Sequence, residues 1–106
     1  MLLKDALDQI DQLAGDDVVF ARKPWLLDSD AVIGKLDARL CVPAEIRSMG
    51  FDYFMEVNVA VEVLEVFGAQ EPTLEERRAL LMFYAEHDSY PEWVYERGST
   101  GSGLNS

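Results

Sequence analysis

Apolar residues recur at helical spacing in two segments of the chain. In residues 2–14 they repeat every three or four positions, which predicts an amphipathic helix. Residues 57–67 fit both a helical stripe and an alternating strand, and their length and the following Gly68 favour a helix. Thr73 and Glu76 match a capping box, so a further helix is expected over residues 74–87.

Clusters of β-branched and aromatic residues between turn-forming residues predict strands. The predicted strands are residues 16–23, 31–37 and 51–56. The turn chemistry of residues 28–30 makes the first two a hairpin-like pair, and residues 40–42 extend the second strand or form another. A short helix over residues 44–49 is expected after Pro43. The expected fold class is α+β: a small antiparallel sheet of three or four strands packed by three or four helices.

Length and composition predict one globular domain over residues 1–96, because 106 residues of which 49% are hydrophobic can bury a modest core. Residues 97–106 are rich in glycine and serine and are expected to form a flexible tail. Cys41 has no partner for an internal disulfide, and its neighbours Leu40 and Val42 predict a buried thiol in a reducing compartment. No apolar run resembles a signal peptide or a membrane span, so a cytoplasmic protein is expected.

The charge is strongly acidic and unevenly distributed. The net charge is −11 at pH 7, and residues 51–96 contain eleven acids but only two bases, Arg77 and Arg78. Such a surface repels phosphate backbones and anionic lipid, which argues against direct binding of nucleic acid or membrane. It attracts a basic protein instead, although acidity for solubility alone also explains the composition.

The segment FYAEHDSYPEW, residues 83–93, contains the chain's only histidine, His87, between two acids. A general base held by Asp88 is one interpretation. On a helix, however, adjacent side chains point in different directions, so Glu86 and Asp88 cannot both reach the imidazole. A helix-end residue is the simpler interpretation. No phosphate-binding loop and no pair of histidines or cysteines at metal spacing occurs, so neither a cofactor nor a metal is expected.

The order of elements resembles a known class of small bacterial proteins. The stretches that carry the resemblance are KPWLLDSD, VPAEIRSMGFDYFME and FYAEHDSYPEW, within residues 1–95. Together they resemble the acidic immunity proteins of contact-dependent growth-inhibition systems. The resemblance implies a non-enzymatic protein that binds and neutralises a cognate toxin domain, and a nuclease with a basic cleft is the expected toxin.

Acids and aromatic residues near the C-terminus are the expected partner-binding residues, because aromatics supply contact area while carboxylates accelerate encounter. The predicted set is Glu62, Glu65, Glu86, Asp88, Tyr90, Glu92 and Trp93. Whether Tyr90, Trp93 and Tyr95 are exposed or fold back over the core stays open. Two other functions also stay open: an acidic adaptor or nucleic-acid mimic of another pathway, and a small hydrolase that uses His87 and Asp88.

Overall fold

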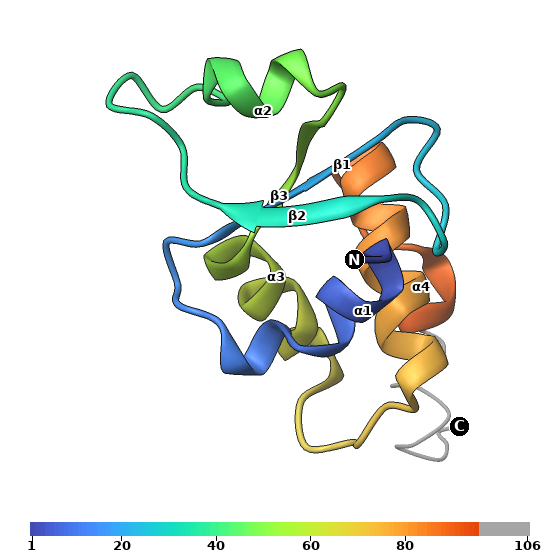
Figure 1. Cartoon of the computed structure of the whole chain (residues 1–106). Helices are drawn as coiled ribbons and strands as arrows, with labels where there is room; N and C mark the ends of the chain where they lie inside the picture. Colours follow the sequence, from blue (N-terminus) through green and yellow to red (C-terminus); the bar gives the residue numbers. More distant parts are fainter. Residues whose placement is uncertain (96–106) are drawn as a thin grey trace, which may run out of the picture.

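The computed structural model describes residues 1–95, which form a three-stranded antiparallel sheet with helices on both of its faces (Figure 1). The strands are β1 (Val18–Ala21), β2 (Ala31–Gly34) and β3 (Asp52–Glu56), in the order β2-β1-β3. The helices are α1 (Leu3–Asp8), α2 (Ala44–Ser48), α3 (Val57–Leu64) and α4 (Leu74–His87), with 3-10 turns η1 (Ile10–Gln12) and η2 (Glu65–Phe67). The predicted α+β fold class is confirmed. The predicted tail, residues 97–106, lies outside the described residues.

The central strand β1 is buried on both faces of the sheet because helices cover each side. Val18 and Phe20 pack with residues on the side of α2, whereas Val19 and Ala21 join the larger core formed with α1, α3 and α4. The predicted hairpin of the first two strands is confirmed, with Val19 opposite Ile33 on β2. Figure 1 shows α2 alone on one face and the other three helices together on the opposite face.

The larger core contains most of the residues expected there. Leu7, Ile10 and Leu81 are buried, as the helical stripes predict. The helix expected over residues 74–87 also predicts that Tyr84 is buried with Leu81, but Tyr84 is only partly covered. The reason is its place near the C-terminal end of α4, where its ring lies at the rim of the core and meets Tyr90, 5.4 Å away between ring centroids. The prediction of a fully buried Tyr84 is therefore wrong.

The strands predicted over residues 16–23 and 31–37 are shorter than expected, and two other predicted elements differ more from those observed. The helix expected over residues 2–14 ends at Asp8 and continues as η1, although Leu3, Leu7 and Ile10 remain on one buried side. Residues 40–42 are not a strand, because hydrogen bonds to Asp37 hold the chain in a turn there. The Asp37 carboxylate accepts hydrogen bonds from the backbone N–H groups of residues 39 and 41, at 2.8 and 2.9 Å.

Cys41 is exposed, so the expectation of a buried thiol is wrong. Leu40, the residue before it, has a φ of 62° and is 77% exposed, and only Val42 turns inward. Apolar neighbours in sequence predicted burial, but the turn held by Asp37 directs two of the three side chains to solvent.

The helices at the C-terminal end of the domain begin and end as predicted. Residues 57–67 are helical, as α3 and η2, and Gly68 ends them with a φ of 60°. The capping box is present: the Thr73 N–H donates to Glu76 Oε1 at 2.8 Å, and the Glu76 N–H donates to Thr73 Oγ1 at 3.0 Å. Length and capping signals therefore outweighed the alternating valines of residues 57–63.

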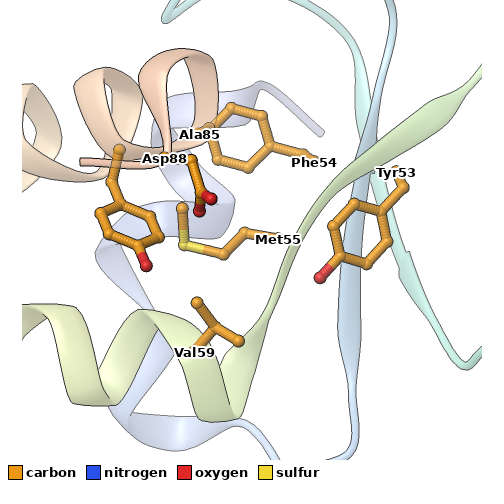
Figure 2. A pocket seen from close by; sticks show the side chains of 7 residues that line it. Tyr53, Phe54, Met55, Val59, Ala85 and Asp88 are labelled. Carbon is orange, nitrogen blue, oxygen red and sulfur yellow. The ribbon is translucent and has the colours of Figure 1, made fainter.

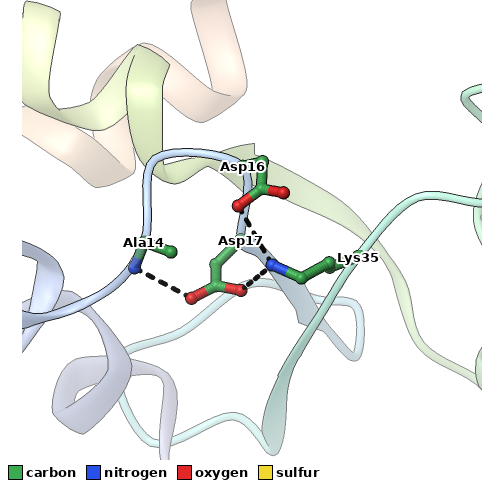
Figure 3. A network of polar contacts seen from close by, with 4 residues as sticks. All are labelled: Ala14, Asp16, Asp17 and Lys35. Carbon is green, nitrogen blue, oxygen red and sulfur yellow. Dashed lines mark hydrogen bonds and ion pairs between the residues drawn. The ribbon is translucent and has the colours of Figure 1, made fainter.

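An ion-pair network fixes the start of α3 relative to the sheet (Figure 3). Lys35 Nζ, just after β2, lies 3.0 Å from an Asp16 carboxylate oxygen and 2.8 Å from one of Asp17. Asp17 also accepts the backbone N–H of Ala14 at 3.0 Å through its other oxygen. The carbonyl of Asp17 in turn accepts the N–H of Val57, the first residue of α3. The network thus ties β2, the loop before β1 and α3 together.

This network predicts a pH dependence of stability. The hydrogen bond from Lys35, followed by that from Ala14, lowers the pKa of Asp17 from its ordinary value of 3.8. Because the folded pKa lies below the unfolded one, the stabilisation is complete above about pH 4 and is lost as the pH falls through the folded pKa. Asp17→Asn should therefore flatten the acid side of the unfolding free energy against pH, measured by urea denaturation from pH 2 to 6. Asp28→Asn should leave that slope unchanged, and equal slopes in all three proteins would contradict the prediction.

Candidate functional site

Five acids of the C-terminal half form no ion pair within residues 1–95, and the two bases of that half pair with N-terminal acids. Arg77 pairs with Asp11 at 3.0 Å, and Arg78 binds Asp8 through two hydrogen bonds. The Asp8 contact is also the main cause of the raised pKa of Arg78. Within residues 1–95, no ion pair includes Glu62, Glu65, Glu86, Asp88 or Glu92. Negative charge is therefore left uncompensated on α3 and after α4.

Tyrosines of the C-terminal segment form a cluster near two of these acids. Tyr90 lies against Tyr84 and Tyr95, at 5.4 and 6.4 Å between ring centroids. Burial raises the pKa of Tyr90, and the neighbouring Tyr84 and Tyr95 and then Glu62 and Glu65 add to the increase. Because α3 packs against α4, Glu62 and Glu65 of α3 are close enough to Tyr90 for this effect.

A hollow of about 230 Å³ adjoins this surface, beside β3 (Figure 2). Its walls come from β3, from α3 and from the end of α4. The lining residues are Tyr53, Phe54, Met55, Val59, Tyr84, Ala85 and Asp88. Figure 2 shows the Asp88 carboxylate turned toward the thioether of Met55, with Val59 below them. Tyr53 stands on the other side of β3 from Met55, so the hollow lies at the edge of the sheet.

Shared residues join the hollow and the tyrosine cluster into one continuous surface, since Tyr84 belongs to both. We call this surface the tyrosine–acid face. It comprises Tyr53, Val59, Glu62, Glu65, Tyr84, Asp88, Tyr90 and Tyr95. Four of the seven residues predicted to bind a partner lie on it: Glu62, Glu65, Asp88 and Tyr90.

The other three predicted residues are placed elsewhere. Glu86 lies on another side of α4, where it borders a hollow with Lys23, Pro24 and Trp25. Trp93 is partly buried and packs on Phe67, with ring centroids 6.2 Å apart, so it faces the core. Glu92 is exposed, and no ion pair in the described residues joins it to the face.

A second apolar hollow, of about 540 Å³, lies between the β1–β2 loop and α4. Trp25, Leu26, Leu27, Ala79 and Met82 form its apolar part, and Glu75 and Arg78 its polar part. Leu26 is 55% exposed there. Arg78 is already bound to Asp8, so this hollow offers apolar contact more than free charge.

His87 and Asp88 do not form a hydrogen-bonded pair in the described part of the chain. The His87 ring is exposed at the end of α4 and stacks on Phe83, with centroids 4.3 Å apart. Asp88 ends the helix in a left-handed conformation, with a φ of 55°, and its N–H donates to the carbonyl of Tyr84 at 2.8 Å. Its carboxylate lines the hollow beside β3 instead. The geometry that a His–Asp dyad requires is thus not seen.

Sequence reasoning missed Tyr53, Val59 and Tyr84 as members of the face. Tyr53 was assigned to a strand and Tyr84 to the core, and only the pairing of β3 with the end of α4 brings them together. No alternation along β3 indicates this, because Tyr53 is exposed whereas Phe54 and Met55 are both buried.

Comparisons with protein-family models, with curated proteins and with solved structures found no match to this chain. In residues 1–95, no three His, Cys, Asp or Glu side chains are grouped so that they could hold a metal ion. No helix of that part is long and apolar enough to cross a bilayer.

Proposed function

We propose that this chain is an immunity protein that binds a basic toxin domain in the cytoplasm and neutralises it without catalysis. The observation that carries the proposal is the tyrosine–acid face. On it, Glu62, Glu65 and Asp88 have no cationic partner within residues 1–95, and they surround exposed and half-buried tyrosines.

Electrostatic reasoning supports a basic protein as the partner. Uncompensated carboxylates on one face create a negative potential that accelerates encounter with a positive surface. Tyrosine rings then provide contact area at a small entropic cost, because each has only two side-chain torsions to immobilise. A nuclease suits this surface, since its phosphate-binding cleft is basic and an acidic domain can occupy it or lie beside it.

The test uses the gene immediately upstream, which in an immunity locus encodes a large secreted protein with a variable C-terminal domain. Expression of that C-terminal domain should arrest growth, and coexpression of this chain should restore it. Association and dissociation rates of the two purified proteins should be measured at two salt concentrations. We expect association to slow as salt rises, because exposed charges are screened over about 8 Å at physiological ionic strength.

Charge reversal on the face should slow this association. The triple variant Glu62→Lys, Glu65→Lys and Asp88→Lys should reduce the association rate at least tenfold and weaken its salt dependence. The matched control reverses Asp28, Glu45 and Glu75, which lie outside the face. Both variants change the net charge from −11 to −5, so a difference between them reports position and not total charge.

The rival functions predict other results. His87→Asn should leave growth protection and affinity within about threefold, a change of roughly 0.7 kcal/mol or less. A hundredfold loss in that variant with the fold intact would favour chemistry at His87. Equal slowing in the two triple variants would move the interface off the tyrosine–acid face, with the hollow around Trp25 as the next place to examine. Failure to protect against the upstream domain would overturn the immunity proposal and leave an acidic adaptor or a nucleic-acid mimic.

A further inference from the structure

The hollow beside β3 is the size of one side chain. Its volume of about 230 Å³ lies below the roughly 300 to 1,000 Å³ of sites for small molecules. Phe54 and Met55 are nearly fully buried and form its apolar floor. Tyr53, which is 38% exposed, and Asp88, which is exposed, stand at its solvent side.

The charged groups that residues 1–95 place at this hollow are acidic. Asp88 lines it, and Glu56 lies beside it, with its carboxylate 3.4 Å from the Tyr53 hydroxyl. Among residues 1–95, no lysine, arginine or histidine lines the hollow. An anionic side chain would therefore be repelled, and a purely apolar one would lie against a carboxylate that it cannot neutralise.

The position of Asp88 is fixed by the backbone. Its left-handed conformation ends α4, and the hydrogen bond from its N–H to the Tyr84 carbonyl holds it there. Because the backbone at Asp88 is already ordered, little backbone entropy is lost when the carboxylate binds a ligand. A smaller entropic cost leaves more of the contact energy as affinity.

We propose that this hollow binds the side chain of one lysine or arginine. Such a side chain has an apolar stem that can lie on Phe54, Met55 and Val59. Its charged end can then reach the Asp88 carboxylate and the rings of the flanking tyrosines, which attract cations electrostatically. That the side chain belongs to a protein, the basic toxin domain, rests on the proposed function.

Small amides test the site without the toxin. N-acetyl-lysine methylamide and N-acetyl-arginine methylamide should be titrated into the whole chain at low salt, with N-acetyl-norleucine methylamide as the uncharged counterpart. The methyl signals of Met55 and Val59 report binding by NMR. We expect saturable shifts of both signals with the two cationic amides and at least fivefold weaker binding of the norleucine amide.

Asp88→Asn is the decisive variant, because asparagine also adopts the left-handed conformation and only the charge is removed. It should weaken binding of the cationic amides at least fivefold, whereas Asp28→Asn should not change it. Equal affinity for the norleucine amide, or unchanged binding in Asp88→Asn, would overturn the proposal. So would the absence of saturable shifts in the wild-type chain.

The two proposals can fail separately. If the upstream toxin domain is neutralised equally by wild type and Asp88→Asn, and the amides do not bind, the cation site is wrong and the immunity function stands. If the cationic amides bind but the upstream domain does not, the immunity function is wrong and the site stands as a cation-binding hollow.

Discussion

Leu81→Ala should lower the free energy of unfolding by about 2 to 5 kcal/mol, the range for removing a large aliphatic side chain from a core. Leu81 is 0% exposed and belongs to the core cluster shared by α1, α3 and α4. The truncation leaves a cavity that the surrounding helices and sheet can fill only in part. Urea denaturation of the two proteins measures the difference, with an unchanged slope against urea as the sign that only stability has altered.

Leu74 offers a matched control in the same helix. It is the first residue of α4 and is 48% exposed, so Leu74→Ala removes the same atoms without opening a cavity. Its effect should stay within about 0.5 kcal/mol, as for most surface substitutions. A loss below 1 kcal/mol for Leu81→Ala, or equal losses in the two variants, would show that α4 does not pack on the core through Leu81.

Trp93→Ala should mainly destabilise the free protein. Trp93 is partly buried, and its ring packs on Phe67 at an interplanar angle of 32°. We expect a loss of about 2 to 3 kcal/mol, less than the roughly 3 to 5 kcal/mol for a fully buried aromatic residue. At approximately 4 to 8 °C per kcal/mol for a domain of this size, the thermal midpoint should fall clearly. Differential scanning calorimetry provides the measurement.

Tyr95→Ala is the control for Trp93, because Tyr95 is 59% exposed in the same helical turn. Its thermal midpoint should stay close to that of the wild type, since it covers little of the core. If Trp93→Ala instead left the midpoint unchanged and accelerated dissociation from the toxin domain, Trp93 would be an interface anchor and not part of the core.

The net charge of a segment can be counted from the sequence, but the ion pairs that its charges form cannot. The sequence identifies an acidic half with two arginines, Arg77 and Arg78. It does not identify their partners, Asp11 and Asp8, which are 66 and 70 positions away. When α1 and α4 pack together, these arginines form ion pairs with the two N-terminal acids. The acids of α3 are thereby left without cations in the described chain.

Local signals in the sequence determined the elements of this fold. Helical periodicity, the capping box at Thr73 and the aromatic strand of residues 51–56 each act over a few neighbouring residues, and the structure contains all three. Even the ambiguous residues 57–67 followed length and the stop at Gly68. Predictions were wrong where the exposure of a residue depended on an unusual backbone conformation. Cys41 is an example, because the turn at Asp37 exposes it.

Tertiary structure alone decided the candidate site. The sequence predicted seven acids and aromatics alike as partner-binding residues. In the structure Trp93 packs on Phe67, Glu86 lies on another side of α4, and Asp88 lies at the edge of β3. The reason is that a side chain's direction depends on backbone conformation: Glu86 follows the geometry of α4, whereas the left-handed Asp88 turns the chain after it. Tyr53 joined the site because β3 pairs with β1 on one edge and leaves its other edge beside Asp88, a juxtaposition of residues 35 positions apart that no local pattern encodes.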